Sequence, residues 1–328
     1  MPVVDTHAHF WPEPLLDHIR AGRYAPLRLE ESEGVEWLVH SAGLRYPLLP
    51  TFIDRGAKLE QMSRDGIDIA LDSIPAPYFF YDLEPEETLS VSRVFNDAIA
   101  EHANESGGRI KGLATVPLND PGLAAEELRR ARKDLGLVGV EIGTSLDTQM
   151  LDDPKFDPVF AAAQELRLPV MLHPYLSMLH EQLPMGLDRS LLGVIFANPV
   201  ETTAAAGRLV LGGVFDRFPE LVVQLVHGGG YFPYQLGRLQ RAYEINPALS
   251  EGAARAPIEY LDNLIFDTVI FEPQAVHFLV KVVGANRVVL GTDQPFLLSD
   301  TTLLTMETLS PEDAELALGA NATRVFGL

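Results

Sequence analysis

The sequence predicts an α/β protein that folds as a (β/α)8 TIM barrel, and two observations lead to this prediction. Short runs rich in valine, isoleucine and leucine recur along the 328 residues, as expected for parallel strands that are buried on both faces. Longer helical patterns separate these runs, and eight strand–helix units in succession indicate a closed barrel. The eight predicted strands cover residues 3–7, 67–73, 110–116, 138–142, 169–173, 221–227, 264–268 and 288–293.

Helix-start signals lie between the predicted strands at regular intervals. In each signal a proline falls near the first helical turn, where its missing N–H group costs nothing. Apolar residues at helical spacing, with charged residues between them, predict helices over residues 124–135 and 159–166. The signals are Asn119-Asp120-Pro121, Asp153-Pro154, Asn198-Pro199, Glu272-Pro273 and Ser310-Pro311.

Residues 13–50 interrupt this alternation, because they are too long for an ordinary connection between the first strand and its helix. We expect a small insertion with β character that packs over the active-site end of the barrel. The rest of the chain keeps the pattern, so we expect one TIM-barrel domain over residues 1–328. The partly alternating residues of the insertion are Tyr24, Val35, Trp37, Val39 and Tyr46.

The composition excludes several classes of protein. The chain has no cysteine, which rules out disulfides, thiolate nucleophiles and cysteine-bound zinc. A net charge of −21 argues against nucleic acid or an anionic membrane as a partner, and means that an anionic substrate needs local arginines. No basic segment precedes an apolar stretch at the N-terminus and no apolar run reaches spanning length, so we expect a cytoplasmic protein.

The residues that indicate chemistry lie at the carboxyl ends of predicted strands, where barrels of this kind carry their active sites. His7 and His9 are two residues apart on the first strand, so their side chains point to the same face. His173, His227 and Asp293 end the fifth, sixth and eighth predicted strands. The chain has nine histidines, and four of them at strand ends form a pattern that chance placement does not explain.

Three imidazoles and a carboxylate are a ligand set for a divalent first-row metal, most naturally zinc, with manganese as the alternative. We expect one such ion with an open position for a water, which ionises near neutral pH on such an ion. His227, which precedes three glycines, is the candidate general acid/base beside that water. We assign a structural role to Asp5, which precedes the histidine pair.

The sequence lacks the motifs of other enzyme classes. The run His227-Gly228-Gly229-Gly230 is similar to the oxyanion-hole motif of some esterases, but no G-x-S-x-G nucleophile elbow accompanies it. Neither a phosphate loop of the G-x-x-x-x-G-K type, nor a dinucleotide fingerprint, nor an H-E-x-x-H zinc motif occurs. A metal-centred interpretation therefore accounts best for the strand-end residues.

An ordered set of motifs resembles the amidohydrolase superfamily, and within it the branch that contains 2-amino-3-carboxymuconate-6-semialdehyde decarboxylase. The resemblance covers nearly the whole chain. Its motifs are Asp5-x-His7-x-His9, His173-Pro174, His227-Gly-Gly-Gly and Gly291-Thr292-Asp293-x-Pro295, with further matching stretches at residues 139–144, 199–203 and 212–219.

This resemblance implies a barrel of the metal-dependent hydrolase type and a role for each matching residue. His7, His9, His173 and Asp293 match the ligands of a single metal ion. His227 matches the acid/base histidine beside the metal-bound water. In superfamily members with two metals, a modified lysine at the end of the fourth strand bridges them; here that strand offers only Glu141.

Two arginines look like the substrate-binding groups of that branch. Arg45, in the insertion, matches an arginine that binds a substrate carboxylate. Arg238 matches an arginine that family members donate across a dimer interface into the neighbouring active site, which implies a homodimer. Tyr175 and Phe296 are expected to contact the substrate. Tyr175-Leu176 stands where Trp-Asp is expected and Gln294 where tyrosine is usual, so the substrate of the namesake enzyme does not transfer directly.

The expected function is a metal-dependent, non-oxidative decarboxylase, a carbon–carbon lyase that acts on an unsaturated or aromatic carboxylic acid. In this hypothesis His227 or Asp293 moves a proton onto the carbon that loses carbon dioxide. The alternative is a metal-dependent hydrolase or hydratase that acts on a lactone, an amide or a C–C bond, because related barrels use nearly the same ligands. A metal-binding barrel with a structural or regulatory role is the non-enzymatic alternative. A structural site, however, would normally be closed by four protein ligands with no adjacent base.

Overall fold

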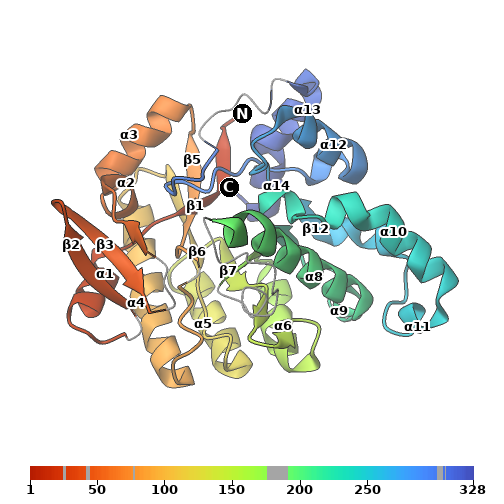
Figure 1. The fold of residues 1–328 in the computed structure, drawn as a ribbon, viewed down its shortest axis with the longest axis horizontal. Coiled ribbons are helices and arrows are strands. Elements are labelled where there is room, and N and C mark those ends of the chain that lie inside the picture. The colour runs from red at the N-terminus through yellow and green to blue at the C-terminus, as the bar shows by residue number, and fades with distance from the viewer. Residues whose placement is uncertain (25–26, 42–44, 77, 176–190, 301–305, 307) are drawn as a thin grey trace.

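The computed structural model describes residues 1–24, 27–41, 45–76, 78–175, 191–300, 306 and 308–328. Its centre is a curled sheet of seven parallel strands in the order β1-β5-β6-β7-β10-β11-β12 (Figure 1). This arrangement confirms the predicted α/β barrel. The strands are β1 (Val4–His9), β5 (Ile69–Ser73), β6 (Ile110–Ala114), β7 (Gly139–Gly143), β10 (Val170–His173), β11 (Val223–Leu225) and β12 (Leu264–Phe266).

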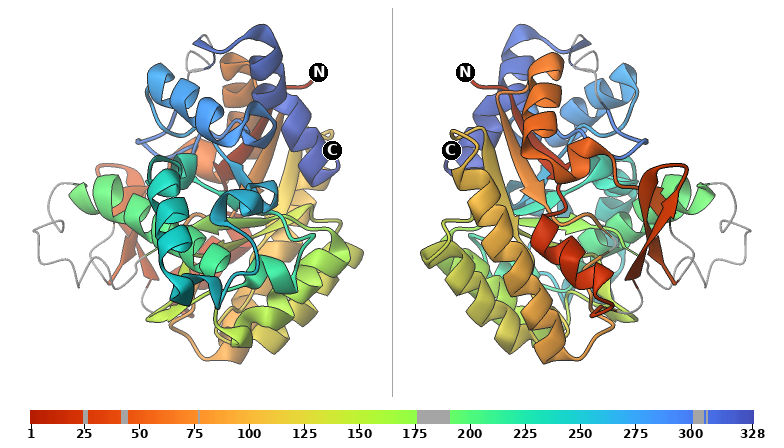
Figure 2. Two further views of the ribbon diagram at one scale, coloured as in Figure 1. Left: turned by 90° about the vertical axis from the view of Figure 1, so that its right-hand side faces the viewer. Right: turned by 90° about the vertical axis from the view of Figure 1, so that its left-hand side faces the viewer.

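Helices cover the outside of this sheet, as the two side views in Figure 2 show. They are α1 (Glu13–Arg20), α2 (Pro50–Ile53), α3 (Arg55–Asp65), α4 (Pro85–Asn104), α5 (Pro121–Lys133), α6 (Asp157–Leu166), α8 (Asn198–Leu211), α9 (Val214–Arg217), α10 (Phe232–Ile245), α11 (Pro247–Ser250), α12 (Pro273–Val283), α13 (Pro311–Glu315) and α14 (Asn321–Phe326). Short 3-10 or π turns cover Pro154–Phe156, Gly193–Ala197, His227–Gly229, Pro257–Asn263, Ala285–Arg287 and Leu316–Ala320, and a small hairpin joins β8 (Ser145–Leu146) to β9 (Gln149–Met150). Within the described ranges, no helix is both long and apolar enough to cross a membrane.

The eighth predicted strand, over residues 288–293, is wrong as a regular strand. Isolated parallel bridges link Val288 to Phe266 of β12, and Gln294, the residue after the segment, to Ala8 of β1, so the segment still lies between the last and first strands and closes the barrel. Asp293 has a left-handed backbone conformation with a φ of 60°, which a β ladder does not accommodate. The ladder is therefore interrupted at a residue whose side chain enters the candidate site.

Most of the proline signals mark helix starts as predicted. The side chain of Asp120 caps α5 by accepting two backbone N–H groups, and Glu272 and Ser310 cap α12 and α13. Helix α8 also begins at the signal Asn198-Pro199, but the π turn Gly193–Ala197 precedes it without a break. Pro199 therefore lies inside a helical segment, where the wider turn before it accommodates the missing N–H donor.

Apolar side chains fill the part of the barrel interior that lies away from the carboxyl ends of the strands. They form a cluster separate from the larger core, and most of the parallel strands contribute to it. Because side chains alternate along a strand, a residue two positions farther along points into the same interior nearer the carboxyl end; His173 stands in this relation to Met171. His173 thereby lies at the carboxyl end of the barrel, beyond the apolar cluster. The buried members of the cluster are Val4, Leu71, Leu113, Met171, Val226, Ile265, Val289, Ala322 and Phe326.

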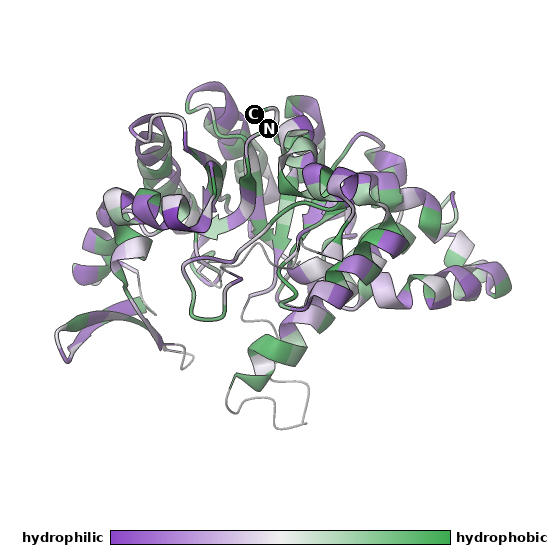
Figure 3. Ribbon diagram, turned by 90° about the horizontal axis from the view of Figure 1, so that it is seen from above, coloured by the Kyte–Doolittle hydropathy of each residue, from purple (hydrophilic) through white to green (hydrophobic). Residues whose placement is uncertain are grey.

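The structure confirms the β character predicted for residues 13–50. Three antiparallel strands, β2 (Leu27–Ser32), β3 (Val35–His40) and β4 (Arg45–Pro47), follow helix α1, which the sequence pattern did not indicate. Figure 3 shows this small sheet projecting at the end of the molecule toward which the barrel strands point. Tyr46 of β4 packs against Phe296 with ring centroids 5.4 Å apart, so the insertion reaches the side chains around the site.

Candidate metal centre and active site

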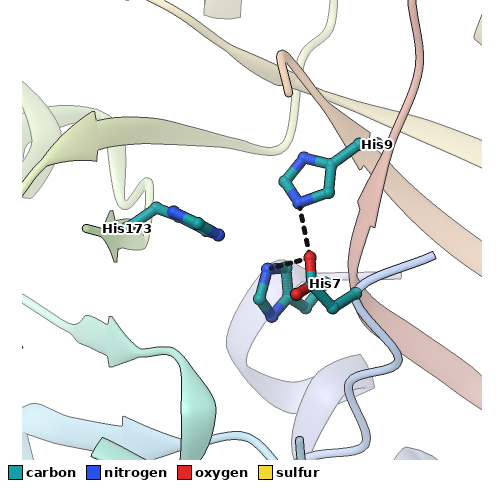
Figure 4. Close-up of side chains that lie close together, drawn as sticks. His7, His9 and His173 are labelled. Atoms are coloured by element: carbon teal, nitrogen blue, oxygen red, sulfur yellow. Dashed lines mark hydrogen bonds and ion pairs between the residues drawn. The ribbon is translucent and has the colours of Figure 1, made fainter. Parts of the chain in front are cut away.

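Four of the strand-end residues converge at the carboxyl end of the barrel. His7 and His9 come from β1, His173 from β10 and Asp293 from the closing segment (Figure 4). Each offers one ligand atom, and these four atoms all lie within 4.8 Å of one another. The sequence prediction that the two β1 imidazoles project together is confirmed, with ring centroids 5.2 Å apart. The arrangement constitutes a divalent metal site.

Hydrogen bonds orient the imidazoles so that Nε2 faces the centre of the site. The Nδ1 atom of His9 lies 3.2 Å from the carbonyl oxygen of Ile74, and that of His173 lies 2.7 Å from the carbonyl oxygen of Pro174. A carbonyl accepts only, so each Nδ1 carries the proton and each Nε2 keeps a lone pair. In the described part of the chain, the buried Nε2 atoms of His7 and His173 have no hydrogen-bond partner. A divalent cation fits these donors and would satisfy them.

Asp267 orients the third imidazole, and the sequence analysis missed it. Its Oδ2 lies 2.8 Å from Nδ1 of His7, while its Oδ1 accepts the backbone N–H groups of Gly228 and Val269 at 2.9 and 3.1 Å. Both side chains are fully buried. A carboxylate behind a metal-binding histidine fixes the tautomer and raises the basicity of the ligand. Asp267 directly follows β12, so a search of the carboxyl ends of the strands could have found it.

The carboxylate of Asp293 joins the metal site to His227. Its Oδ1 lies 3.1 Å from Nε2 of His9 and 3.5 Å from Nε2 of His7, and its Oδ2 lies 3.4 Å from Nε2 of His227. Burial alone would raise the pKa of Asp293, but the charge of His7 and the hydrogen bond from His227 hold it well below its ordinary value. The ionised carboxylate is thus available as a ligand.

Nearby carboxylates also change the pKa of His7. Burial lowers the pKa of its imidazole, but the carboxylates of Asp293 and Asp267 outweigh that effect and raise the pKa to about 9. In contrast, burial and the neighbouring imidazole of His7 hold the pKa of His173 well below its usual range. A proton on His7 and a metal ion therefore compete for one position, and metal binding releases a proton.

His227 lies beside the four-residue cluster, two residues after the end of β11. Its ring centroid lies 5.1 Å from that of His173 and 5.3 Å from that of His7. The backbone of His227 is left-handed, with a φ of 54°, and Gly228, Gly229 and Gly230 also have positive φ. At Gly230 a side chain would collide with the carbonyl oxygen of Pro199. The glycine run thus lets the chain turn sharply and place the His227 imidazole next to Asp293.

Of the two aromatic residues predicted to contact substrate, Phe296 lies against a metal-binding histidine. Phe296 packs against His9 with ring centroids 5.3 Å apart and also against Phe52. Tyr175, half-buried, packs edge-on against Tyr81 and accepts the backbone N–H of Asp147 at 3.2 Å. Phe296 supplies a flat apolar surface next to the His9 imidazole, and the contact of either aromatic residue with a substrate stays a prediction.

The two arginines predicted to bind carboxylates are both exposed. The guanidinium carbon of Arg45 lies 4.1 Å from the centre of the Trp37 ring. Because side chains alternate along β4, Arg45 lies on the opposite face of the strand from Tyr46. Arg238 lies on α10. The single chain does not test either role, so both stay predictions.

Glu141, the residue considered as a metal bridge, lies fully buried on β7. Burial raises the pKa of its carboxyl to about 8, and the charge of His7 offsets only part of this effect. In the metal-free protein the group is therefore mostly neutral at pH 7. A buried neutral acid next to ionised ligands makes the stability of this protein depend on pH.

The Glu141→Gln substitution is expected to stabilise the metal-free protein at neutral and alkaline pH. Below the ordinary pKa of 4.5 the group is protonated in both the folded and the unfolded chain and contributes nothing. From there to about pH 8 the unfolded chain ionises while the folded chain does not, which costs on the order of 5 kcal/mol at the upper end. The Tm gain of the variant, measured in chelator, should grow from pH 5 to pH 8; a pH-independent difference would contradict this account.

The barrel and its metal site define the class of this protein. A model of the amidohydrolase family matches residues 4–328, and the chain belongs to that family. Within it, the chain lies in the branch of decarboxylases similar to 2-amino-3-carboxymuconate-6-semialdehyde decarboxylase. The enzyme of that name from Dictyostelium discoideum is 32% identical over 282 residues, which cover 84% of this chain and 77% of the relative.

Further relatives and solved structures are also decarboxylases. A gamma-resorcylate decarboxylase of a Polaromonas species is 31% identical over 252 residues, covering 74% of this chain and 77% of the relative. The structure of a dihydroxybenzoic acid decarboxylase from Polaromonas with bound manganese has a TM-score of 0.82 at 25% identity, over 100% of this chain and 97% of that chain. The 5-carboxyvanillate decarboxylase of Sphingomonas paucimobilis shares the fold, with a TM-score of 0.83 at 24% identity over 100% and 99% of the two chains.

Proposed function

We propose that this protein is a metal-dependent, non-oxidative decarboxylase of a small aromatic or unsaturated carboxylic acid. The observation that carries the proposal is the position of His227, whose Nε2 lies 3.4 Å from the carboxylate of the metal ligand Asp293. A proton carrier thus stands beside the position of the metal ion. The relatives named above perform this class of reaction on their own substrates.

The three imidazoles and the carboxylate of Asp293 would hold the ion, and we propose zinc as the native metal with manganese as the alternative. When bound, the ion supplies positive charge that binds and polarises an oxygen of the substrate. His7 and His173 contribute neutral Nε2 donors, and Asp293 contributes the one negative charge among the four side chains. The walls next to His9 are aromatic, which suits a flat substrate.

His227 is the proposed donor of the proton that replaces carbon dioxide on the substrate. Loss of carbon dioxide breaks a C–C bond and leaves its electron pair on the substrate carbon, which must then take up a proton. The protonated His227 imidazole donates that proton, and its Nε2 lies beside the carboxylate of Asp293. We propose that Arg45 and Arg238 bind the remaining acidic groups of the substrate, as bidentate arginines bind carboxylates.

Release of carbon dioxide is the first measurement to make. Protein loaded with zinc or manganese is expected to release it from a member of a panel of carboxymuconate semialdehydes and ortho-hydroxy or ortho-amino aromatic acids. A chelator should stop the release, and added metal should restore it. Silence across the panel with the metal bound, together with turnover of a lactone or an amide, would overturn the decarboxylase in favour of a hydrolase.

The role proposed for Arg238 predicts a homodimer with shared active sites. Its side chain is exposed on α10, where a partner chain could receive it. Inactive His227→Asn and Arg238→Ala variants, mixed under conditions that exchange subunits, should regain up to about a quarter of wild-type activity through hybrid dimers with one intact site. Mixtures that exchange subunits but stay inactive would remove Arg238 from the partner's site.

A further inference from the structure

A buried ionic cluster lies on the outer side of the sheet, behind the metal-binding end of β1. Lys58 of α3 places its Nζ 2.6 Å from Oδ1 of Asp72 on β5, and Nε2 of His102 on α4 lies 3.2 Å from the other carboxylate oxygen. The three side chains are at most 5% exposed. Phe10, the residue after β1, stacks on the His102 ring with centroids 3.6 Å apart.

This cluster is connected to the metal site through one hydrogen bond. Nζ of Lys58 donates to the backbone carbonyl of His9 at 3.0 Å, and both groups are buried. The imidazole of the same residue is also held: Nδ1 of His9 lies 3.1 Å from the hydroxyl oxygen of Ser73, and that hydroxyl donates to the carbonyl of Ala8. His9 is therefore held at its backbone by Lys58 and at its ring by the end of β5.

The end of β1 needs such additional restraint. The register between β1 and β5 shifts between Asp5 and Ala8, so the ladder is irregular directly before His9. A displacement of β1 at this point would move the Nε2 atom of His9 away from the other three ligand atoms. Metal sites lose affinity steeply when a ligand leaves its position, because the remaining donors no longer share one centre.

Stability alone does not explain a lysine in this place. Taking an ammonium and a carboxylate out of water costs about as much as their attraction returns, and apolar replacements of buried pairs are often equally stable. An apolar side chain could fill the same volume, but it could not donate to the His9 carbonyl. The feature specific to Lys58 is thus its hydrogen bond to the metal-binding strand.

We propose that Lys58, anchored by Asp72, is a positioning residue of the metal centre that holds the end of β1 and thereby sets the metal affinity of His9. The inference rests on the metal site alone and not on the reaction proposed above. Affinity can be measured without turnover, so its outcome is separable from that of the decarboxylase assay.

The test is the dissociation constant for zinc and for cobalt in the double variant K58M/D72N, measured by competition with a chelator. Removing both charges avoids leaving Asp72 ionised and unpaired, so the variant should fold. Outer partners of metal ligands typically contribute 10- to 100-fold to affinity, and we expect a loss in that range. The visible absorption of bound cobalt should also shift, because it reports the ligand geometry.

A second ionic cluster provides the matched control. Glu127, fully buried, bonds to Arg130 and to Asn96 between α4 and α5. The variant E127Q/R130M makes the same chemical change there and should lower Tm comparably, while the Kd for zinc stays within about threefold of wild type.

A further variant keeps the proposal testable if K58M/D72N does not fold. K58Q/D72N retains a neutral N–H donor one atom short of the lysine position, and its affinity should fall between those of K58M/D72N and wild type. Wild-type Kd values in either folded variant would overturn the proposal. An equal loss of affinity in E127Q/R130M would do so as well, because it would show that general destabilisation is the cause.

Discussion

Replacing His173 with alanine is expected to abolish metal binding and turnover together. The Nε2 atom of His173 is buried without a hydrogen-bond partner in the described structure, and it points at the ligand atoms of His7, His9 and Asp293. Its removal leaves three ligands around a cavity that the chain cannot close. We expect metal affinity to fall by at least about 100-fold, more than for the loss of an outer partner, and carbon dioxide release to reach the background rate. Metal content after dialysis and the initial rate check both parts.

The control for this experiment is a histidine outside the site. His277 lies on α12 and is not a member of the metal-binding group. The His277→Ala variant should keep its full metal content and rate. If the His173→Ala protein retains one tightly bound ion per chain after dialysis, the assignment of His173 as a ligand is wrong. Circular dichroism separates this outcome from loss of the fold.

The His227→Asn substitution is expected to have the opposite pattern, with metal retained and turnover lost. Asparagine keeps a polar side chain of similar reach but cannot carry a proton at neutral pH. General acid–base groups contribute about 10²- to 10⁴-fold, and we expect kcat to fall within that range while metal content stays complete. The measurement is the rate of carbon dioxide release at saturating substrate, together with the metal content of the same sample.

The pH profile of this variant distinguishes a proton donor from a binding residue. In the wild-type enzyme kcat should depend on the protonation state of His227, and in the variant that limb of the profile should disappear. An unchanged profile with a raised KM would assign His227 to substrate binding instead. Full activity of the variant would remove it from the mechanism.

The residues at the carboxyl ends of the predicted strands include most of the candidate site, because of the geometry of parallel strands. Their carboxyl ends meet at one end of the barrel, so side chains far apart in sequence gather there without any knowledge of contacts. Asp267 was not among the residues found because the predicted strand extended to residue 268, whereas β12 ends at Phe266. An error of two residues in a strand boundary thus concealed the partner of His7.

Other features were beyond the sequence pattern. Lys58 lies on a helix with several exposed polar residues, and nothing in its spacing distinguishes a buried lysine from an exposed one. The irregular segment over residues 288–294 looks like a regular apolar strand, since composition does not report the left-handed turn at Asp293. The helix start at Asn198-Pro199 was predicted, but the sequence pattern did not indicate the π turn Gly193–Ala197 that runs into it.

The sequence by itself determined the fold class, the end of the barrel that carries the chemistry and the residue types that gather there. These follow from periodicity and strand order, which are local properties of the chain. Only the tertiary structure decided which imidazole nitrogen is available to a metal, how Asp293 joins the metal site to His227, and which lysine supports β1. Those features depend on hydrogen bonds such as that between His7 and Asp267, which are 260 residues apart, and such bonds form only when the barrel closes.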